Sequence, residues 1–353
     1  MNVNDKKLKI LFCGLGSIGQ RHLRNTITIL GENVELLAYR KRNDSPVLNA
    51  DMSVRENAVL ANVYPLTEFS DLQEALNQKP DIVFITNPNT EHLKTAIEAA
   101  KHGCHLFIEK PVSHSMAGIT ELTALVEAKK LKVFVAYQFR YHPAMKQIQD
   151  WLNQGLLGSL LSSHIVNAEY LPHWHPYEDY AKTHPVWTSL GGGCYNIQTH
   201  ELDYALWLFG NPTDVFAIGG KRSNLAGDAA DTVDVQMRMH HNNKEFAVHV
   251  HLDYLQWPHK RYFEVIGDAG KIEFDYYSNE LNLYLLEGRK NEKIDFTSFE
   301  RNQMFIDELN NFFTAIRKGS ETEIDLADGL RSLHLSDAIE RSLNSKKVEK
   351  FNG

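Results

Sequence analysis

The feature that most constrains this chain is a glycine-rich turn between two regular segments near its start. Residues 8–13 form an apolar run typical of a buried strand, and residues 20–30 are compatible with a helix. The glycines between them have the spacing of the dinucleotide-binding motif: one allows a tight turn, one allows the backbone to approach a ligand, and one allows the helix to pack on the strand. This spacing predicts a dinucleotide-binding βαβ unit. The alternative is a tight turn that binds no ligand. The cofactor-site residues expected here are Gly14, Gly16, Ser17, Ile18 and Gly19.

Strands and helices keep alternating up to residue 137. Further strands are expected at 34–39, 80–85, 104–108 and 132–137. Helices are expected to end at Gln78, at His102 and at Lys130. This alternation is typical of a parallel, doubly wound sheet, so residues 1–137 are predicted to form an N-terminal Rossmann domain that binds NAD(P).

The second half of the chain follows a different pattern. Apolar and polar residues alternate with a period of two over 233–239 and 246–252, which predicts an antiparallel hairpin with one buried face. A second strand pair is expected around the turn at 267–270, and residues 302–343 are expected to be helical. Residues 138–353 are therefore predicted to form a C-terminal α/β domain with a large, mostly antiparallel open sheet. Its polar face would meet water or a second subunit.

Composition excludes several classes of protein. The 353 residues carry a formal net charge of −8 and no long basic block, which argues against a general nucleic-acid binder. No apolar run is long enough for a membrane span, and the first residues lack a signal core, so a cytoplasmic location is expected. The three cysteines have no disulfide or zinc spacing, and His173 and His175 alone are weak metal ligands, so no metal is predicted.

The residues after the second strand bear on the choice of cofactor. An NAD site usually has an acidic residue there, which binds the ribose 2′-hydroxyl. This chain has Arg40, followed by Lys41 and Arg42. A guanidinium can bind a 2′-phosphate through two hydrogen bonds, so NADP is predicted in preference to NAD. A solvated basic turn, or use of both cofactors, is the alternative.

A second candidate for chemistry follows the strand at 104–108. Proline cannot continue a central strand, so Pro111 forces a turn that leaves Glu109 and Lys110 at its carboxyl end. Ligands of open parallel sheets bind just outside these strand ends. The alternative is a surface ion pair, which would contribute little.

Two segments of the second half suggest substrate binding and catalysis. In the loop that starts near Tyr170, His173 and Trp174 place aromatic rings beside polar groups, which suits a sugar ring; a purely structural loop is the alternative. The glycines at 191–193 precede a predicted helix through Leu208. On that helix Asn196, His200 and Asp203 would share one face, where His200 could transfer a proton near neutral pH. A lone helical histidine is otherwise often structural.

Four segments in this order resemble the Gfo/Idh/MocA family, the group of glucose–fructose oxidoreductase and inositol dehydrogenase. They are residues 14–19 with His22, residues 86–89 with His92, residues 109–111, and residues 191–203. The segment from Gln138 to Pro143 resembles the part of the family where the two domains join. The resemblance covers nearly the whole chain.

The resemblance implies an NAD(P)-dependent dehydrogenase or reductase that moves a hydride between nicotinamide and a carbinol or carbonyl carbon of a sugar, sugar derivative or cyclitol. It implies that Lys110 contacts the reacting hydroxyl and that His200 is the acid/base, while Asn196 departs from the aspartate that is common ahead of this histidine. Further cofactor-binding residues would be Thr86, Asn87, Pro88, His92, Glu109, Lys110, Gln138 and Arg140. Substrate-binding residues would be Lys110, Tyr170, His173, Trp174, Asn196 and His200.

The resemblance also leaves other functions open. Some relatives use bound NAD to hydrolyse glycosides, and others are regulators that sense the cofactor without catalysis. The loop that starts at Glu169 and the Thr199-His200-Glu201 sequence resemble members associated with bacterial surface-sugar synthesis. The family further implies a homodimer or homotetramer that assembles through the C-terminal sheet.

Overall fold

The computed structural model describes residues 7–41, 45–175 and 177–353. The chain forms two compact units. The first contains Met1–Tyr137 and Asn302–Gly329, and the second contains Gln138–Arg301 and Leu330–Gly353. The segment that returns to the first unit contains helix α9 (Asn302–Lys318), which the sequence pattern alone assigned to the second half.

The first unit contains a parallel sheet of six strands in the order β3-β2-β1-β4-β5-β6. Its strands are β1 (Leu8–Cys13), β2 (Val34–Tyr39), β3 (Leu66–Phe69), β4 (Ile82–Ile85), β5 (His105–Ile108) and β6 (Val133–Val135). Strand β1 pairs with β2 on one side and β4 on the other, so the strand order reverses beside it. In open α/β sheets ligands bind at this reversal, outside the carboxyl ends of the strands. The predicted Rossmann sheet is confirmed.

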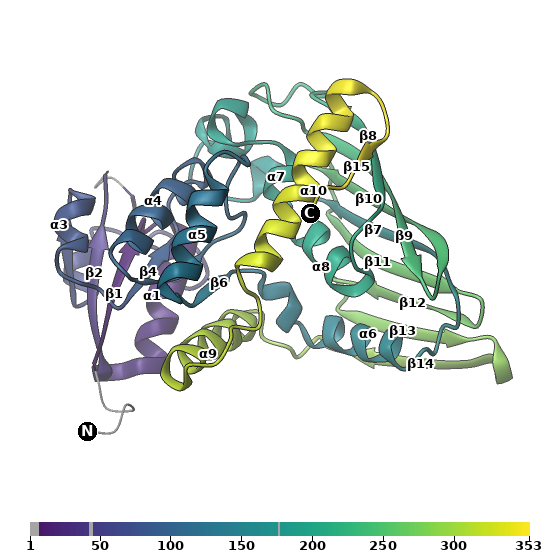
Figure 1. Ribbon diagram of the computed structural model, residues 1–353, viewed down its shortest axis with the longest axis horizontal. Coiled ribbons are helices and arrows are strands. Elements are labelled where there is room, and N and C mark those ends of the chain that lie inside the picture. Colours follow the sequence, from purple (N-terminus) through teal and green to yellow (C-terminus); the bar gives the residue numbers. More distant parts are fainter. Residues whose placement is uncertain (1–6, 42–44, 176) are drawn as a thin grey trace. The chain divides into compact units, whose positions relative to one another are not determined.

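Helices cover both faces of this sheet. Helix α1 (Ser17–Leu30) packs beside α9 on one face, and α4 (Asn89–Lys101) packs beside α5 (Ile119–Lys129) on the other (Figure 1). Two short helices, α2 (Leu60–Val63) and α3 (Leu72–Leu76), complete the unit. All four residues of β4 are buried, as expected for a strand covered on both faces.

A row of phenylalanine rings crosses the sheet on the side of α1 and α9. Phe12, Phe84, Phe107 and Phe134 occupy aligned positions on β1, β4, β5 and β6. The ring centroids of successive neighbours lie 4.6, 4.6 and 5.4 Å apart. Phe312 of α9 packs on this row. Large apolar rings in contact bury much surface, so the row joins the central strands to the returning helix.

The second unit is built on a sheet of nine strands in the order β14-β13-β12-β11-β7-β10-β9-β8-β15. Only the β7–β10 pair is parallel among these pairings. The strands are β7 (Leu160–Ala168), β8 (Asp214–Gly220), β9 (Thr232–His241), β10 (Lys244–Asp253), β11 (Lys260–Gly267), β12 (Gly270–Asp275), β13 (Glu280–Leu285), β14 (Lys290–Asp295) and β15 (Glu349–Lys350). The predicted large, mostly antiparallel sheet is confirmed.

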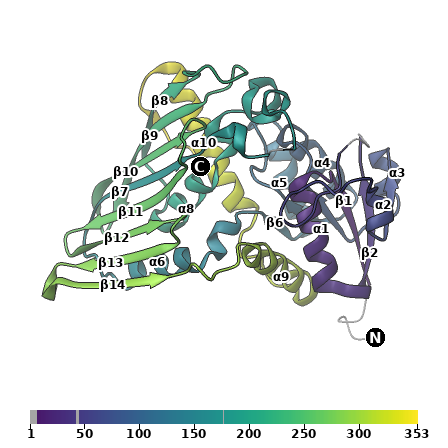
Figure 2. The ribbon, with the colours of Figure 1, turned by 180° about the vertical axis from the view of Figure 1, so that it is seen from behind.

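One face of this sheet carries the helices. Figures 1 and 2 show α6 (Pro143–Asn153), α8 (His200–Phe209) and α10 (Leu326–Ser345) on the same face. Along β9, residues 233, 235, 237 and 239 are buried and alternate with exposed ones, as the period of two predicted. Helix α7 (Cys194–Ile197) precedes α8. No helix within the described residues is long and apolar enough to cross a membrane.

Short 3₁₀ helices connect the regular elements. They are η2 (Gly31–Asn33), η3 (Gln138–Tyr141), η4 (Leu171–His173), η5 (Tyr180–Lys182), η6 (His184–Val186), η7 (Thr188–Leu190) and η8 (Glu287–Arg289). Four of them, η4 to η7, lie between β7 and α7, so the predicted substrate loop is a chain of tight turns.

The phenylalanine row predicts a large stability effect at its centre. Phe107 is fully buried between two rings of the row, so Phe107→Ala should lower the free energy of unfolding of the first unit by about 3–5 kcal/mol. Val59→Ala, at an exposed position of the same unit, should change it by less than about 0.5 kcal/mol. Denaturant unfolding followed by circular dichroism measures both, and equal losses would contradict a core role for the row.

Candidate functional site

The glycine turn is shaped by contacts with the loop after β4. Gly14 has φ +96°, and a Cβ atom there would lie 2.8 Å from the Asn87 main chain. A Cβ on Gly19 would lie 2.4 Å from the Gly14 carbonyl oxygen. At Gly16, by contrast, a Cβ would meet no atom within 4 Å, so the turn is open on that side. Two glycines are therefore required for packing, and the third faces open space.

The start of α1 is suited to an anion. The helix begins at Ser17, its N-cap Gly16 offers no side-chain hydrogen bond, and its first turn has no acidic residue. The N–H groups of such a turn carry a partial positive charge that attracts a phosphate. Gly16 and the first residues of α1, Ser17 and Ile18, are among the predicted cofactor-site residues.

Thr86 joins the loops after β1 and β4. Its hydroxyl donates a hydrogen bond of 2.6 Å to the Gly14 carbonyl, and its N–H donates one of 3.0 Å to the Cys13 carbonyl. The Gly14 N–H donates to the Tyr39 carbonyl at the end of β2, at 3.1 Å. Three strand ends are thus connected around the glycine turn.

The basic residues after β2 have acidic partners. Arg40 is only 8% exposed, and its Nη1 lies 3.2 Å from Oε2 of Glu68 on β3. Lys41 forms an ion pair of 2.8 Å with Glu91. Arg42 lies outside the described residues. The end of β2 therefore presents a guanidinium with a carboxylate beside it, a pairing for which the sequence held no signal.

His92 links the loops after β4 and β5. One ring nitrogen lies 2.8 Å from the Asn87 carbonyl oxygen, and the other lies 2.7 Å from that of Pro111. Burial lowers the pKa of His92, which favours the neutral ring, and that form donates to one of the two carbonyls. Pro88 caps α4 between these residues, and the Asn87 side chain donates to Thr95 at 2.9 Å.

Glu109 is a buried group and not one half of a surface ion pair. It is 7% exposed, and its Oε1 accepts a hydrogen bond of 2.7 Å from Nε2 of His22 on α1. Its Oε2 accepts the N–H of Lys110 at 3.2 Å. The Glu109-Lys110-Pro111 turn therefore places a fixed carboxylate at the end of β5, with the half-buried Lys110 next to it.

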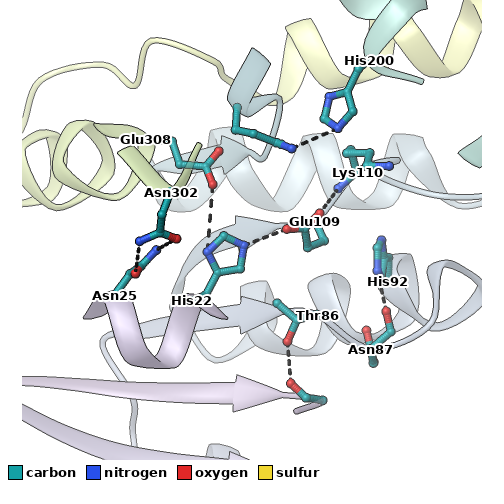
Figure 3. A network of polar contacts seen from close by, with 12 residues as sticks. His22, Asn25, Thr86, Asn87, His92, Glu109, Lys110, His200, Asn302 and Glu308 are labelled. Carbon is teal, nitrogen blue, oxygen red and sulfur yellow. Dashed lines mark hydrogen bonds and ion pairs between the residues drawn. The ribbon is translucent and has the colours of Figure 1, made fainter. Parts of the chain in front are cut away.

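His22 also faces a second carboxyl group. Its Nδ1 lies 4.0 Å from Oε1 of Glu308 on α9, whose side chain is completely buried (Figure 3). Burial, as the larger cause, and the charge of Glu109, as the smaller one, raise the pKa of Glu308 well above its usual range. Glu308 therefore favours its protonated form.

In the second unit, the predicted single helix from the glycines to Leu208 is wrong. Helix α7 ends at Ile197 and α8 begins at His200. Gln198, with φ −88° and ψ 48°, breaks the helix between them. Asn196 and His200 therefore do not share a helical face, and the Asn196 side chain donates to the Gly192 carbonyl at 3.4 Å.

His200 lies at the start of α8 in a buried polar setting. Nε2 of the Gln138 amide is 3.2 Å from Nε2 of His200 and donates to it when the neutral ring carries its proton on Nδ1. The ring of Phe139 packs against the histidine with centroids 4.9 Å apart. Gln138, a predicted cofactor-binding residue, is thus a neighbour of His200.

Two buried ion pairs hold the first turn of α8. Asp203 binds Arg140 through two hydrogen bonds of 2.7 and 2.9 Å. Glu201 binds Arg261 of β11 at 2.6 Å. Burial disfavours the charge on Arg261, but the charge of Glu201 opposes this, and the pKa of Arg261 lies above its usual range. Arg140, a predicted cofactor-binding residue, thus takes part in anchoring the helix that carries His200.

The candidate substrate loop contributes to an aromatic cluster. Tyr170 and His173 pack edge to face at 4.9 Å, and His173 packs in the same way on Trp257 at 5.1 Å. Trp257 is 66% exposed, so the cluster reaches the surface. Trp174 instead packs on the buried Tyr254 at 5.5 Å. Among the described residues, no three acidic, histidine or cysteine side chains are grouped to hold a metal.

Several of these partners could not be found from local sequence. Glu68, Arg261 and Glu308 belong to no recognisable sequence motif, and each meets its partner only through the fold. Trp257 lies after β10, and its exposure, which would indicate a surface site, is known only from the folded chain. The three cysteines are buried, and burial raises the pKa of Cys194, so it is no candidate nucleophile.

Comparison with known proteins agrees with this geometry. Residues 8–137 match the model of the Gfo/Idh/MocA oxidoreductase family for its NAD-binding Rossmann fold. Residues 152–350 match the C-terminal alpha/beta domain of the same family. The chain belongs to the Gfo/Idh/MocA family of oxidoreductases. The resemblance inferred from the motifs is confirmed.

Relatives of this Gfo/Idh/MocA protein include sugar-related enzymes. Myo-inositol 2-dehydrogenase of Thermotoga maritima is 24% identical over 362 residues, covering 98% of each chain. Among solved structures, the WlbA dehydrogenase of Bordetella pertussis in complex with NADH and UDP-GlcNAcA has a TM-score of 0.81 at 19% identity, covering 99% of each chain. Levoglucosan dehydrogenase in complex with NADH also has a TM-score of 0.81, at 21% identity, covering 98% of this chain and 99% of that one. These two structures show the same fold.

The glycine turn gives a prediction with a matched control. Gly103 has φ +81° and open space around its Cβ position, so Gly103→Ala should cost only the backbone strain of about 1–2 kcal/mol. Gly14→Ala adds overlap with the Asn87 main chain and should cost roughly 1–3 kcal/mol more. Thermal unfolding compares the two variants. Equal destabilisation would mean that the close approach of the two loops does not constrain Gly14.

Proposed function

We propose that this oxidoreductase transfers a hydride between a nicotinamide nucleotide and a carbinol or carbonyl carbon of a sugar, sugar derivative or cyclitol. The observation that carries the proposal is the carboxyl edge of the parallel sheet. There the open glycine turn and the Glu109-Lys110-Pro111 turn belong to the same unit and are joined through His22. The names of the inositol and levoglucosan dehydrogenases support a polyhydroxylated substrate.

The residues of the first unit fit a dinucleotide. The open space beside Gly16 and the uncapped start of α1 suit a pyrophosphate. A side chain at Gly14 or Gly19 would overlap main-chain atoms, so the turn could not keep this shape. Thr86, Asn87, Pro88, His92 and Glu109 would line the nicotinamide half. When bound, the nicotinamide supplies C4 as the donor or acceptor of the hydride.

Lys110 and His200 would have different roles in the reaction. Lys110 would contact the reacting hydroxyl, where an ammonium group stabilises negative charge that develops on oxygen. His200 would hold or release the hydroxyl proton, because imidazole changes protonation near neutral pH. The Asn196 side chain donates to a carbonyl in its own loop, whereas the ion pairs of Glu201 and Asp203 would help to position His200 by anchoring α8.

The second unit would bind the rest of the substrate. Tyr170, His173 and Trp257 offer ring faces and polar edges, which suit a sugar ring, and we add Trp257 to the set that includes Trp174 and Asn196. The neighbour solved with UDP-GlcNAcA supports including sugar nucleotides among the candidate substrates. The resemblance of the loop that starts at Glu169 adds a role in surface-glycan metabolism to the proposal. We further propose that the protein works in the cytoplasm as a homodimer or homotetramer assembled through the sheet of the second unit.

The proposed chemistry predicts a large effect of Lys110. With the substrate identified from a panel of sugars, cyclitols and sugar nucleotides, Lys110→Ala should lower kcat by about 10²–10³-fold, because the cation at the reacting oxygen is lost. Lys94→Ala, at an exposed position of α4, should leave kcat within about twofold. The absorbance of reduced nicotinamide measures turnover.

Three outcomes would contradict the proposal. Turnover in the Lys110 variant within a few-fold of the wild type would remove the assigned role of this residue. Product formation without net change in nicotinamide absorbance would favour a glycosidase-type relative that uses bound NAD. Tight nucleotide binding without turnover on the whole panel would favour a cofactor-sensing regulator.

We also propose NADP as the preferred cofactor, with the preference limited by Glu68. Arg40 would bind the 2′-phosphate, but its present partner is the Glu68 carboxylate at 3.2 Å, which repels a phosphate. Arg40→Ala should therefore weaken NADPH binding by about tenfold and NADH binding far less, because only NADPH has the 2′-phosphate. Glu68→Gln should shift the ratio of affinities toward NADPH. Fluorescence titration measures each Kd, and equal losses of both nucleotides in the Arg40 variant would contradict the assignment.

A further inference from the structure

Three side chains from separate parts of the first unit form a buried chain behind the nucleotide site. His22 comes from α1, Glu109 from the end of β5 and Glu308 from α9. Nε2 of His22 is 2.7 Å from Glu109, and Nδ1 lies 4.0 Å from Glu308 (Figure 3). Among the described residues, neither His22 Nδ1 nor either Glu308 oxygen has a partner at hydrogen-bonding distance. The two carboxyl groups thus face the two nitrogens of one imidazole.

The surroundings of this chain are apolar. The His22 ring packs edge to face on Phe107 at 4.9 Å and on Phe305 at 6.0 Å, and it tilts against Phe84 at 6.0 Å. His22 and Glu308 are completely buried. A charge in such a setting is costly unless it is paired, so the position of each proton matters.

One proton of this cluster can lie either on Glu308 or on Nδ1 of His22, and the total charge of the three groups is the same in both cases. Either Glu308 is protonated and His22 is neutral, or Glu308 is ionised and His22 is an imidazolium between two carboxylates. In the first arrangement only Glu109, at the edge of the cluster, is charged. Complete burial of Glu308 favours the first arrangement, because it keeps the charge away from the deepest site. Nε2 of His22 then carries the ring proton and donates a hydrogen bond to Glu109.

We propose that His22 is a positioning residue for the nicotinamide half of the nucleotide. A neutral Glu308 leaves Nδ1 of His22 without a proton. The proposal rests on the proposed function of the first unit. Nε2–H of His22 donates a hydrogen bond to Oε1 of Glu109, and the main-chain N–H of Lys110 donates one to Oε2. Each carboxylate oxygen can accept a second hydrogen bond, so the fixed Glu109 remains able to accept one from a nicotinamide ribose hydroxyl.

This role predicts an effect confined to one half of the nucleotide. His22→Phe removes the donor and keeps an aromatic ring, so it should weaken NADH binding by about tenfold, as expected for the loss of a hydrogen bond to a charged group. Binding of ADP, which lacks the nicotinamide riboside, should change by less than about twofold. His22→Gln, whose amide can donate in place of Nε2, should recover most of the NADH affinity. Titration calorimetry measures both ligands.

The outcomes separate this inference from the proposed function. Equal weakening of NADH and ADP in His22→Phe would show a general structural role and overturn the inference. Absence of NADH and ADP binding in the wild type would overturn the proposed function itself. If His22→Phe does not fold, His22→Leu, which also lacks a donor, takes its place. NADH affinity that is lost in His22→Leu and retained in His22→Gln supports the donor role, and equal NADH affinities of the two variants overturn it.

The part played by Glu308 has its own spectroscopic test. In protein labelled with ¹⁵N-histidine, the wild type should show His22 with a protonated Nε2 and a bare Nδ1 at neutral pH. Glu308→Gln keeps a neutral side chain of the same shape and should retain this tautomer. Two protonated nitrogens in the wild type would mean that Glu308 is ionised, and would overturn its role.

Discussion

The close approach of the first and fourth strand ends is the constraint on which the rest of the first unit depends. A hydrogen bond of 2.6 Å from the Thr86 hydroxyl to the Gly14 carbonyl holds the two turns together. The spacing leaves no room for a Cβ atom on Gly14 or Gly19, yet it leaves open space beside Gly16. The same contact that stabilises the fold therefore shapes the place where a pyrophosphate would bind.

Buried charge is handled differently in the two units. In the second unit, Arg140 pairs with Asp203 and Arg261 pairs with Glu201, which anchors the helix that begins at His200. In the first unit, burial leaves the carboxyl of Glu308 without a charged partner at hydrogen-bonding distance, and its protonated form is favoured. Paired charges thus provide rigidity in one unit, while a neutral acid in the other spares the cost of burying a second charge.

Local sequence patterns predicted most of the fold. Apolar runs between helices indicated the parallel sheet, and the period of two over 233–239 indicated the open sheet. The break at Gln198 was not predictable from local sequence, because the side chain of Gln198 donates to the carbonyls of Asn167 and Asp253, which only the fold brings near it. The pairing of Arg40 with Glu68, and of His22 with Glu308, depends on elements that only the folded chain brings together. The motif residues were therefore visible in the sequence, but their partners were not.

Hydride transfer itself is the central claim, and isotope transfer tests it most directly. The protein would be incubated with nucleotide that carries deuterium in both positions at C4 of the reduced nicotinamide and with the oxidised form of a substrate from the sugar panel. The account predicts one deuterium on the carbinol carbon of each product molecule, with an equal amount of oxidised nucleotide. Product that forms without deuterium and without consumption of reduced nucleotide would contradict it.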